Sequence, residues 1–174
     1  MLRPAPHHAG HGLLECLAVL TVVAVLAALA LPAAAEMLNG LRADMLRMTL
    51  HTSLARARNE ALTRRELVGV CASADGLQCG DDWSTGWMMY RSGGRRGPPA
   101  SPSAVLAHHP GRSGLRLSAL ATAGRPLLFF QADGRSPGAN VTLRICQGGQ
   151  VRGEVVVNNG GRARSRRVSQ PSPC

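Results

Sequence analysis

The residues with the clearest chemistry are four arginines near the C-terminus, between Gly161 and Val168. They are Arg162, Arg164, Arg166 and Arg167. The paired glycines before them disfavour a helix, and in an extended chain every second side chain points the same way, about 6.7 Å apart. Phosphates along one DNA strand are spaced about 3.4 Å axially, so such a row would meet alternate phosphates. Because guanidinium groups bind phosphate oxygens in pairs, the run predicts a phosphate-binding face.

Two further residues belong to this prediction. Arg152 is expected on the neighbouring strand, where it would widen the basic face, and Gly161 would let the backbone approach a phosphate closely. Four phosphate contacts would give a log–log salt slope of roughly −3.6 and no dependence on base sequence. The alternative is a solvated edge strand whose charges prevent unwanted pairing.

The composition supports a polyanionic partner and excludes several other functions. The chain has 174 residues and a net charge of +10, and all twenty of its basic residues are arginine. An excess of cations favours nucleic acid or anionic lipid. The lack of lysine excludes a P-loop lysine and Schiff-base chemistry. Only five residues are aromatic, which argues against a platform for stacking single-stranded bases.

No catalytic motif stands out, so the sequence predicts a protein that is not an enzyme and needs no cofactor. It lacks a Gly-x-Ser-x-Gly elbow, a His-Glu-x-x-His pair and a glycine-rich nucleotide loop. Asp81 and Asp82 are adjacent acids, better suited to a turn than to paired acid–base work. Trp83 and Trp87 are expected in the core with their N–H groups bonded. An anchored periplasmic enzyme is the least favoured hypothesis.

The cysteines predict disulfides and an oxidising compartment. Cys16 lies in an apolar run, which leaves four cysteines in the rest of the chain and three ways to pair them. We favour Cys71–Cys79, which brackets a short Asp-Gly turn, and therefore Cys146–Cys174, which would hold the basic tail against the head.

A zinc site is the rival explanation of the cysteines. The eight-residue spacing contains no Cys-x-x-Cys unit, and His108 and His109 are adjacent in a loop-like stretch rather than at ligand spacing. We therefore predict no metal.

An apolar segment from Leu13 to Ala35 is predicted to anchor the rest of the chain in a membrane. Its 23 residues include one charge, Glu15, and as a helix would extend roughly 34 Å, enough to span a bilayer. A cleaved signal peptide is the alternative, but such peptides have a shorter apolar region without an acid inside it. A charge so near the bilayer is expected to have a partner.

A second helical segment follows, from residue 36 to about residue 65. Its apolar residues recur at spacings of three and four, which predicts one face packed against a core. They are Leu38, Leu41, Met45, Leu46, Leu50, Leu54, Ala57, Ala61 and Leu62. Pro32, just before this segment, should bend the helix.

Residues 66–174 contain short β-like runs separated by glycine, proline and Asn-Gly turns, which predicts an antiparallel sheet and an α+β fold. The predicted strands are Leu67–Ala72, Gly86–Arg91, Ala104–His108, Leu115–Leu120, Leu127–Gln131, Val141–Cys146, Val151–Asn158 and Arg162–Val168. The proline-rich stretch Gly93–Ser103 is expected to be an exposed loop.

Several motifs resemble the FimT/GspH branch of type IV pilins and pseudopilins, and the resemblance covers nearly the whole chain. The segment Gly10–Glu15 is similar to a prepilin peptidase site, and Pro32 has the register of the family's helix-kinking proline. His11 departs from the usual phenylalanine. The Cys71–Trp87 segment, Phe130–Arg135 and the Gly-Arg-x-Arg motif at Gly161–Arg164 also resemble this branch, FimT most of all.

The resemblance implies a type IV pilin-like fold with four parts: a leader at 1–10, a membrane and assembly helix at 11–35, an amphipathic helix at 36–65 and a β-rich head at 66–174. Prepilin peptidase would cut after Gly10 and His11 would be N-methylated. Glu15 would then pair with the new α-amino group of a neighbouring pilin.

Location and function also follow from the resemblance. The chain would sit in the inner membrane with its head in the periplasm, although positive-inside counting of Arg3 against Arg42 and Arg47 mildly favours the opposite orientation. In FimT-like minor pilins the Gly-Arg-x-Arg motif is implicated in binding DNA during natural transformation. The alternative is a type II secretion pseudopilin that contacts proteins instead of DNA.

Overall fold

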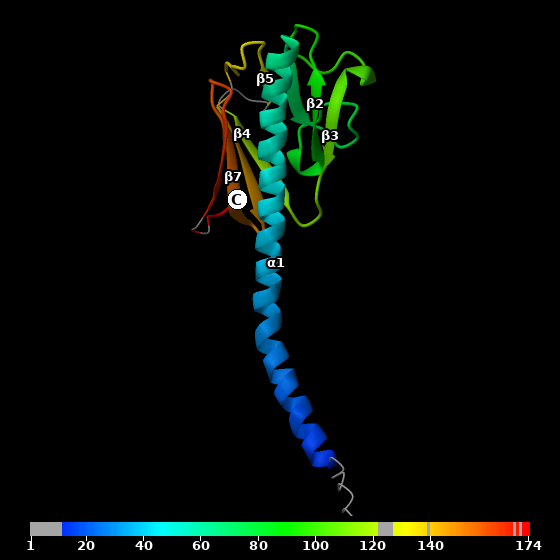
Figure 1. Cartoon of the computed structure of the whole chain (residues 1–174), viewed down its shortest axis with the longest axis vertical. Coiled ribbons are helices and arrows are strands. Elements are labelled where there is room, and N and C mark those ends of the chain that lie inside the picture. The colour runs from blue at the N-terminus through cyan, green and yellow to red at the C-terminus, as the bar shows by residue number, and fades with distance from the viewer. Residues whose placement is uncertain (1–11, 122–126, 139, 169, 171) are drawn as a thin grey trace, which may run out of the picture. The chain divides into compact units, whose positions relative to one another are not determined.

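The computed structural model describes residues 12–121, 127–138, 140–168, 170 and 172–174. In it a long helix precedes eight strands and two short 3-10 turns (Figure 1). The elements are α1 (Leu13–Arg64), β1 (Val68–Ala72), η1 (Trp83–Thr85), β2 (Gly86–Arg91), η2 (Pro102–Ala104), β3 (Val105–Pro110), β4 (Arg116–Ala121), β5 (Leu128–Phe130), β6 (Val141–Gln147), β7 (Gln150–Val157) and β8 (Ala163–Arg167). Every strand predicted from the sequence is present.

Two compact units divide the chain, one up to Asn39 and the other from Gly40 to Cys174. The described part of the first unit is helical from Leu13 onward, and the helix runs through Pro32 without a break. An 18-residue window of α1 has a mean hydropathy of 2.6 and none of it is buried. By length and composition this helix can cross a membrane.

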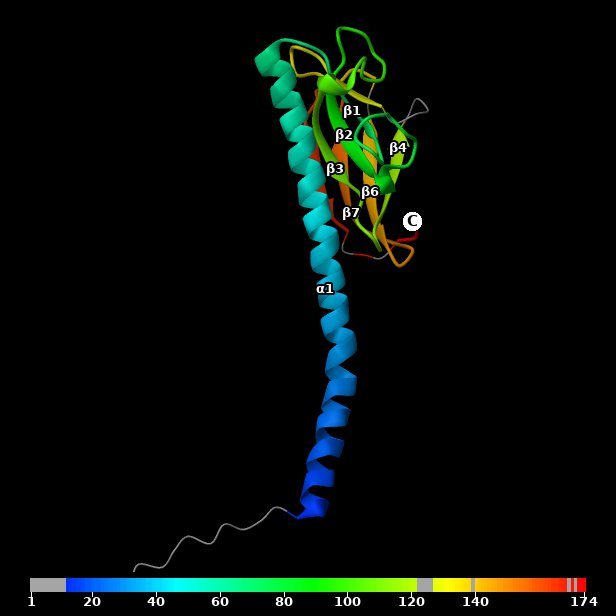
Figure 2. The same ribbon diagram turned by 90° about the vertical axis from the view of Figure 1, so that its right-hand side faces the viewer.

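The strands of the second unit form two antiparallel sheets of four strands, in the orders β3-β2-β1-β5 and β4-β6-β7-β8. The α+β prediction of a long helix with an antiparallel head is therefore confirmed, but the expectation of a single sheet was wrong. Strand β1 pairs with β5, which lies about 60 residues later in the chain. This pairing completes the first sheet, and the strands from β6 onward belong to the second. Figures 1 and 2 show residues of α1 beyond Gly40 lying along both sheets.

The core of the second unit joins the helix to both sheets. The helix contributes a buried row at spacings of three and four, Leu46, Leu50, Leu54, Ala57 and Ala61, which meets apolar side chains from β1, β2, β4, β6 and β7. Four residues of the predicted stripe, Leu38, Leu41, Met45 and Leu62, are instead exposed. Leu41, Met45 and Leu62 are not part of the buried row, and Leu38 belongs to the first unit.

Two tryptophans complete this core as the sequence predicts. Trp83 and Trp87 are buried, and the Trp87 indole N–H donates to Ser53 Oγ at 2.9 Å. The indole also stacks on His109 with ring centroids 5.1 Å apart. His108 and His109 therefore belong to strand β3 and not to a loop, and as strand neighbours they point to opposite faces.

Candidate nucleic-acid interface

The arginine run forms β8, an edge strand of the second sheet, as the paired glycines and alternating pattern predict. It pairs antiparallel with β7, and Arg164 lies opposite Val156 while Arg166 lies opposite Glu154. Ala163 packs against the core and Ser165 accepts a hydrogen bond from Arg47 on the helix, at 2.8 Å. Arg164 and Arg166 consequently share the face of the sheet that points away from the helix.

Arg162 and Arg164 are the two arginines of the run whose charge is available. Both side chains are exposed, and neither forms an ion pair with any residue that the structure describes. The Arg162 backbone N–H donates to Asn158 Oδ1 at 3.2 Å, which fixes the entry to the strand and leaves the guanidinium in solvent. These two groups are the ones that the Gly-Arg-x-Arg motif contains.

Arg166 is less available than the sequence suggested. Its guanidinium donates to Glu154 Oε2 on β7, with Nη2 at 2.7 Å, and the other carboxylate oxygen accepts from Arg144 Nε at 3.1 Å. Glu154 is almost fully buried, with 7% relative exposure. The expectation of a free cation at position 166 is corrected: the acid lies opposite it in the β7–β8 register, and a phosphate would have to compete with that carboxylate.

Arg167 points to the opposite side of the strand and meets the helix. Its Nε donates to Asp44 Oδ1 at 2.9 Å, and a second guanidinium nitrogen contacts the other oxygen. Burial raises the pKa of Asp44, but hydrogen bonds and charges from Arg167 and Arg47 outweigh it and hold that pKa below its ordinary value. Arg167 thus docks the strand to the helix, on the side of β8 opposite the face that alternation gives to Arg164 and Arg166.

Gly161 also serves a different purpose from the one expected. It is buried, its φ is +73°, and the space that a Cβ would need is filled by the carbonyl oxygen of Gly134. That same oxygen accepts from Arg58 Nε at 3.0 Å. The glycine is therefore required by a close approach inside the protein.

Arg152 lies on the neighbouring strand, as predicted, but at its other end. Its carbonyl accepts from the N–H of Val168 at 3.2 Å, so it stands beside the C-terminal end of β8, away from Arg162. Its side chain is half-buried. It would widen the basic face beside Arg166, not beside the Gly-Arg-x-Arg motif.

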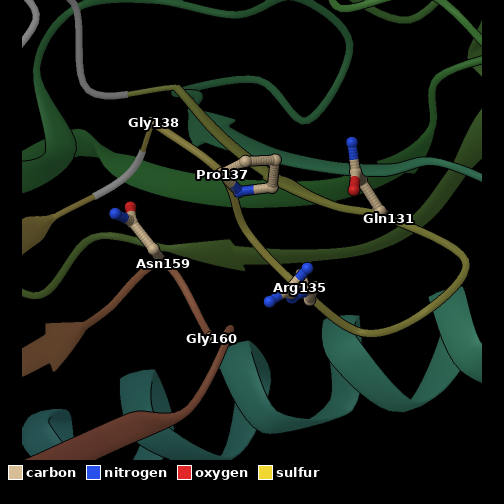
Figure 3. A pocket seen from close by; sticks show the side chains of 6 residues that line it. All are labelled: Gln131, Arg135, Pro137, Gly138, Asn159 and Gly160. Atoms are coloured by element: carbon tan, nitrogen blue, oxygen red, sulfur yellow. The ribbon is translucent and has the colours of Figure 1, made fainter.

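A hollow of about 290 Å³ adjoins the start of this strand. Its walls are Gln131, Arg135, Pro137, Gly138, Asn159 and Gly160, drawn in Figure 3. The loop after β5 supplies four of these residues and the turn after β7 supplies the other two. Sequence reasoning treated Arg135 only as part of a family motif, because nothing local showed that this loop would lie beside residues 158–161.

Both favoured disulfides are present, Cys71–Cys79 and Cys146–Cys174. The second returns the C-terminus to the β6–β7 turn, where Cys174 N–H donates to the Gly149 carbonyl at 3.0 Å. Cys16 is exposed on α1 and forms no disulfide. Within the described ranges no three His, Cys, Asp or Glu side chains gather as a metal would need.

The assembly residues predicted near the N-terminus fall in two groups. Gly10 and His11 lie outside the described residues. Glu15 and Pro32 both lie within α1, in the first unit.

Asp82 takes the turn role expected of it, since its Oδ1 accepts from the Ser84 N–H at 2.8 Å at the start of η1.

Residues 47–161 match the model of a protein family described as type II transport protein GspH. The chain belongs to the GspH family. Its members are minor pilins and pseudopilins, structural proteins without enzymatic activity. Membership confirms the GspH part of the resemblance and the prediction that the chain is not an enzyme.

Solved structures place this GspH-family protein among type IV pilin-like folds. The type IV minor pilin FimU of Pseudomonas aeruginosa has a TM-score of 0.58 at 23% identity, over 75% of this chain and 92% of FimU. The minor pseudopilin EpsH from the type 2 secretion system of Vibrio cholerae has a TM-score of 0.54 at 16% identity, over 74% and 98%. No curated protein matches the chain in sequence. These likenesses are to the fold.

Proposed function

We propose that this GspH-family protein is a FimT-like minor pilin of a type IV pilus that binds DNA without sequence preference through Arg162 and Arg164 during DNA uptake. The observation that carries the proposal is that these two guanidinium groups are exposed, Arg164 on the edge strand β8 and Arg162 directly before it, and that both are free of ion pairs with described residues. Contacts to phosphate alone position a protein on DNA without reading bases.

The surrounding charges support a polyanion as the partner. The chain carries a net charge of +10, and the only acid in β6, β7 or β8 is Glu154, which two arginines already engage. A DNA strand approaching this face would therefore meet cations and no unpaired carboxylate from these strands.

The rest of the proposal concerns assembly and place. Helix α1 would anchor the chain in the inner membrane, prepilin peptidase would cut after Gly10, and Glu15 would pair with the N-terminus of a neighbouring pilin. The head would face the periplasm, because both disulfides lie within residues 71–174 and need an oxidising compartment.

A second candidate function is that of a type II secretion minor pseudopilin, which would contact other pseudopilins instead of DNA. It is favoured by the description of the matching family and by the likeness to EpsH. On this view β8 would be a charged edge strand that resists pairing.

A DNA-binding assay separates the minor pilin from the pseudopilin. Fluorescence anisotropy at low salt measures how a labelled DNA duplex binds to the detergent-solubilised full chain. Replacing Arg162 and Arg164 together by glutamine should weaken binding about tenfold or more. The matched control replaces Arg42 and Arg116 by glutamine. These are two exposed arginines outside β8, so the control removes the same charge. Equal affinities for the two double variants would overturn the assignment, and no DNA binding at all would favour the pseudopilin.

A further inference from the structure

Three loops from distant parts of the sequence meet around the hollow beside β8. The loop after β5 is tied to the turn after β7 because the Ser136 N–H donates to the Asn159 carbonyl at 3.0 Å. It is tied to the loop after β2 because Arg96 Nη2 donates to the Pro137 carbonyl at 3.1 Å. These two hydrogen bonds, one between backbones and one from the Arg96 side chain, connect the loops that form the walls of the hollow.

Two cations stand at this site, and neither is neutralised by a described acid. Arg135 lines the hollow and is exposed, and Arg96 is exposed at the loop that contacts Pro137. The nearest acid in sequence, Asp133, has a carboxylate oxygen that accepts from the Arg135 backbone N–H at 2.9 Å. That bond turns the loop and leaves the Arg135 guanidinium outside any ion pair with described residues.

The hollow lies next to the Gly-Arg-x-Arg motif. A Cβ placed on Gly161 would lie 3.4 Å from the carbonyl carbon of Arg135, so the backbones of the two loops touch immediately before Arg162. Asn159 and Gly160, which form one wall, belong to the turn that leads into β8. Figure 3 shows Arg135 and Asn159 on different chain segments around the opening.

We infer that this hollow is a second contact site for the DNA backbone, in which a phosphodiester group meets Arg135, the side-chain amide of Asn159 and, at the rim, Arg96. The inference rests on the proposed DNA binding and extends it from β8 to the loops after β2 and β5. A guanidinium and an amide N–H both donate to phosphate oxygens. Base stacking is not involved, since none of the lining residues is aromatic.

The extension changes the expected salt dependence. Arg162 and Arg164 alone would give a log–log slope of about −1.8 with duplex DNA, and the addition of Arg96 and Arg135 gives about −3.6. Single-stranded DNA should show a smaller slope for the same four contacts, about −2.8.

The test compares two double variants of the full chain in detergent, Arg96→Gln with Arg135→Gln and Arg162→Gln with Arg164→Gln, by anisotropy over a range of salt. The first pair should weaken duplex binding about tenfold and reduce the magnitude of the slope by about 1.8. Wild-type affinity and slope in that variant, with loss in the second, would overturn this inference and leave the proposed function standing. No loss in either variant would overturn both.

A third variant tests the hollow itself without removing a cation. Asn159→Asp places a carboxylate in the wall, so it should weaken DNA binding severalfold if a phosphate enters there. Gln78→Glu, which adds the same charge at an exposed position outside both the hollow and β8, is its control. Equal affinities for these two variants would contradict a phosphate in the hollow. Circular dichroism checks that each variant is folded.

Discussion

The carbonyl oxygen of Gly134 occupies the position in which a Cβ on Gly161 would stand. This single approach connects the loop after β5 to the turn that begins the arginine strand. It also lies next to Arg58 of α1, whose Nε donates to the same carbonyl. The glycine of the Gly-Arg-x-Arg motif therefore positions Arg162 through packing, while the arginines provide the charge.

Replacement of Gly161 by alanine should destabilise the protein by roughly 2 kcal/mol or more, because the φ of +73° and the Gly134 oxygen both oppose a side chain. Thermal unfolding of the detergent-solubilised chain measures the effect. Gly160→Ala is the control, since its Cβ would meet Asn158 Oδ1 at an ordinary 3.4 Å. Equal melting temperatures for the two variants would contradict the packing role.

Glu154 is expected to restrain DNA binding. Its carboxylate engages both Arg144 and Arg166, so Glu154→Gln should release two guanidinium groups and raise duplex affinity severalfold, with a steeper salt slope by about 0.9 for each new contact. Anisotropy titrations across salt concentrations provide the measurement. Glu60→Gln, on the helix, is the control because it removes the same negative charge elsewhere. An equal gain in DNA affinity from this variant would show a general charge effect only.

Asp44 should make the docking of β8 sensitive to acid. Its pKa in the folded protein lies below the ordinary 3.8, so its ion pairs stabilise the protein above that pH, and this stability is lost as the pH falls through the lowered pKa. Asp44→Asn should cost about 1 kcal/mol at neutral pH and little in strong acid. Urea unfolding from neutral pH to about pH 3 tests this, and a constant difference across that range would contradict it.

The proposed pairing of Glu15 with a neighbouring pilin can be tested through filament assembly. Its replacement by alanine removes the one charge of the apolar segment, so membrane insertion should remain intact while incorporation into filaments falls, because the partner α-amino group loses its carboxylate. Membrane fractionation and immunoblots of sheared filaments separate the two steps. Glu36→Ala, on the same helix beyond the apolar segment, is the control, and normal incorporation of the Glu15 variant would refute the pairing.

Local patterns in the sequence predicted the elements well and their partners poorly. Strand β8 was recognisable because two glycines stop a helix and the following residues alternate. Its position at the edge of the sheet depends on two pairings. Strands β6 and β7 pair across a two-residue turn, and β8 then pairs with β7 after a longer turn. The division into two sheets was not predictable, since it depends on β1 meeting a strand far along the chain.

The availability of each arginine could not be predicted from the run itself. Arg166 meets an acid twelve residues earlier on β7, and Arg167 meets one on the helix, 123 residues away. Alternation explains the outcome once the sheet is known, because Arg167 faces the helix while Arg164 and Arg166 face outward. Arg135 was assigned only to a family motif for the same reason: its loop meets the turn before Arg162 through the approach of Gly134 to Gly161.

The salt dependence of duplex DNA affinity is the most direct test of the central claim that Arg162 and Arg164 bind phosphate. The log–log slope of the Arg162→Gln, Arg164→Gln variant should be smaller in magnitude than that of the full chain by about 1.8, with weaker binding at every salt concentration. With the hollow as a second contact site, this means about −1.8 for the variant against about −3.6 for the full chain. A variant whose slope and affinity equal those of the wild type would contradict the claim.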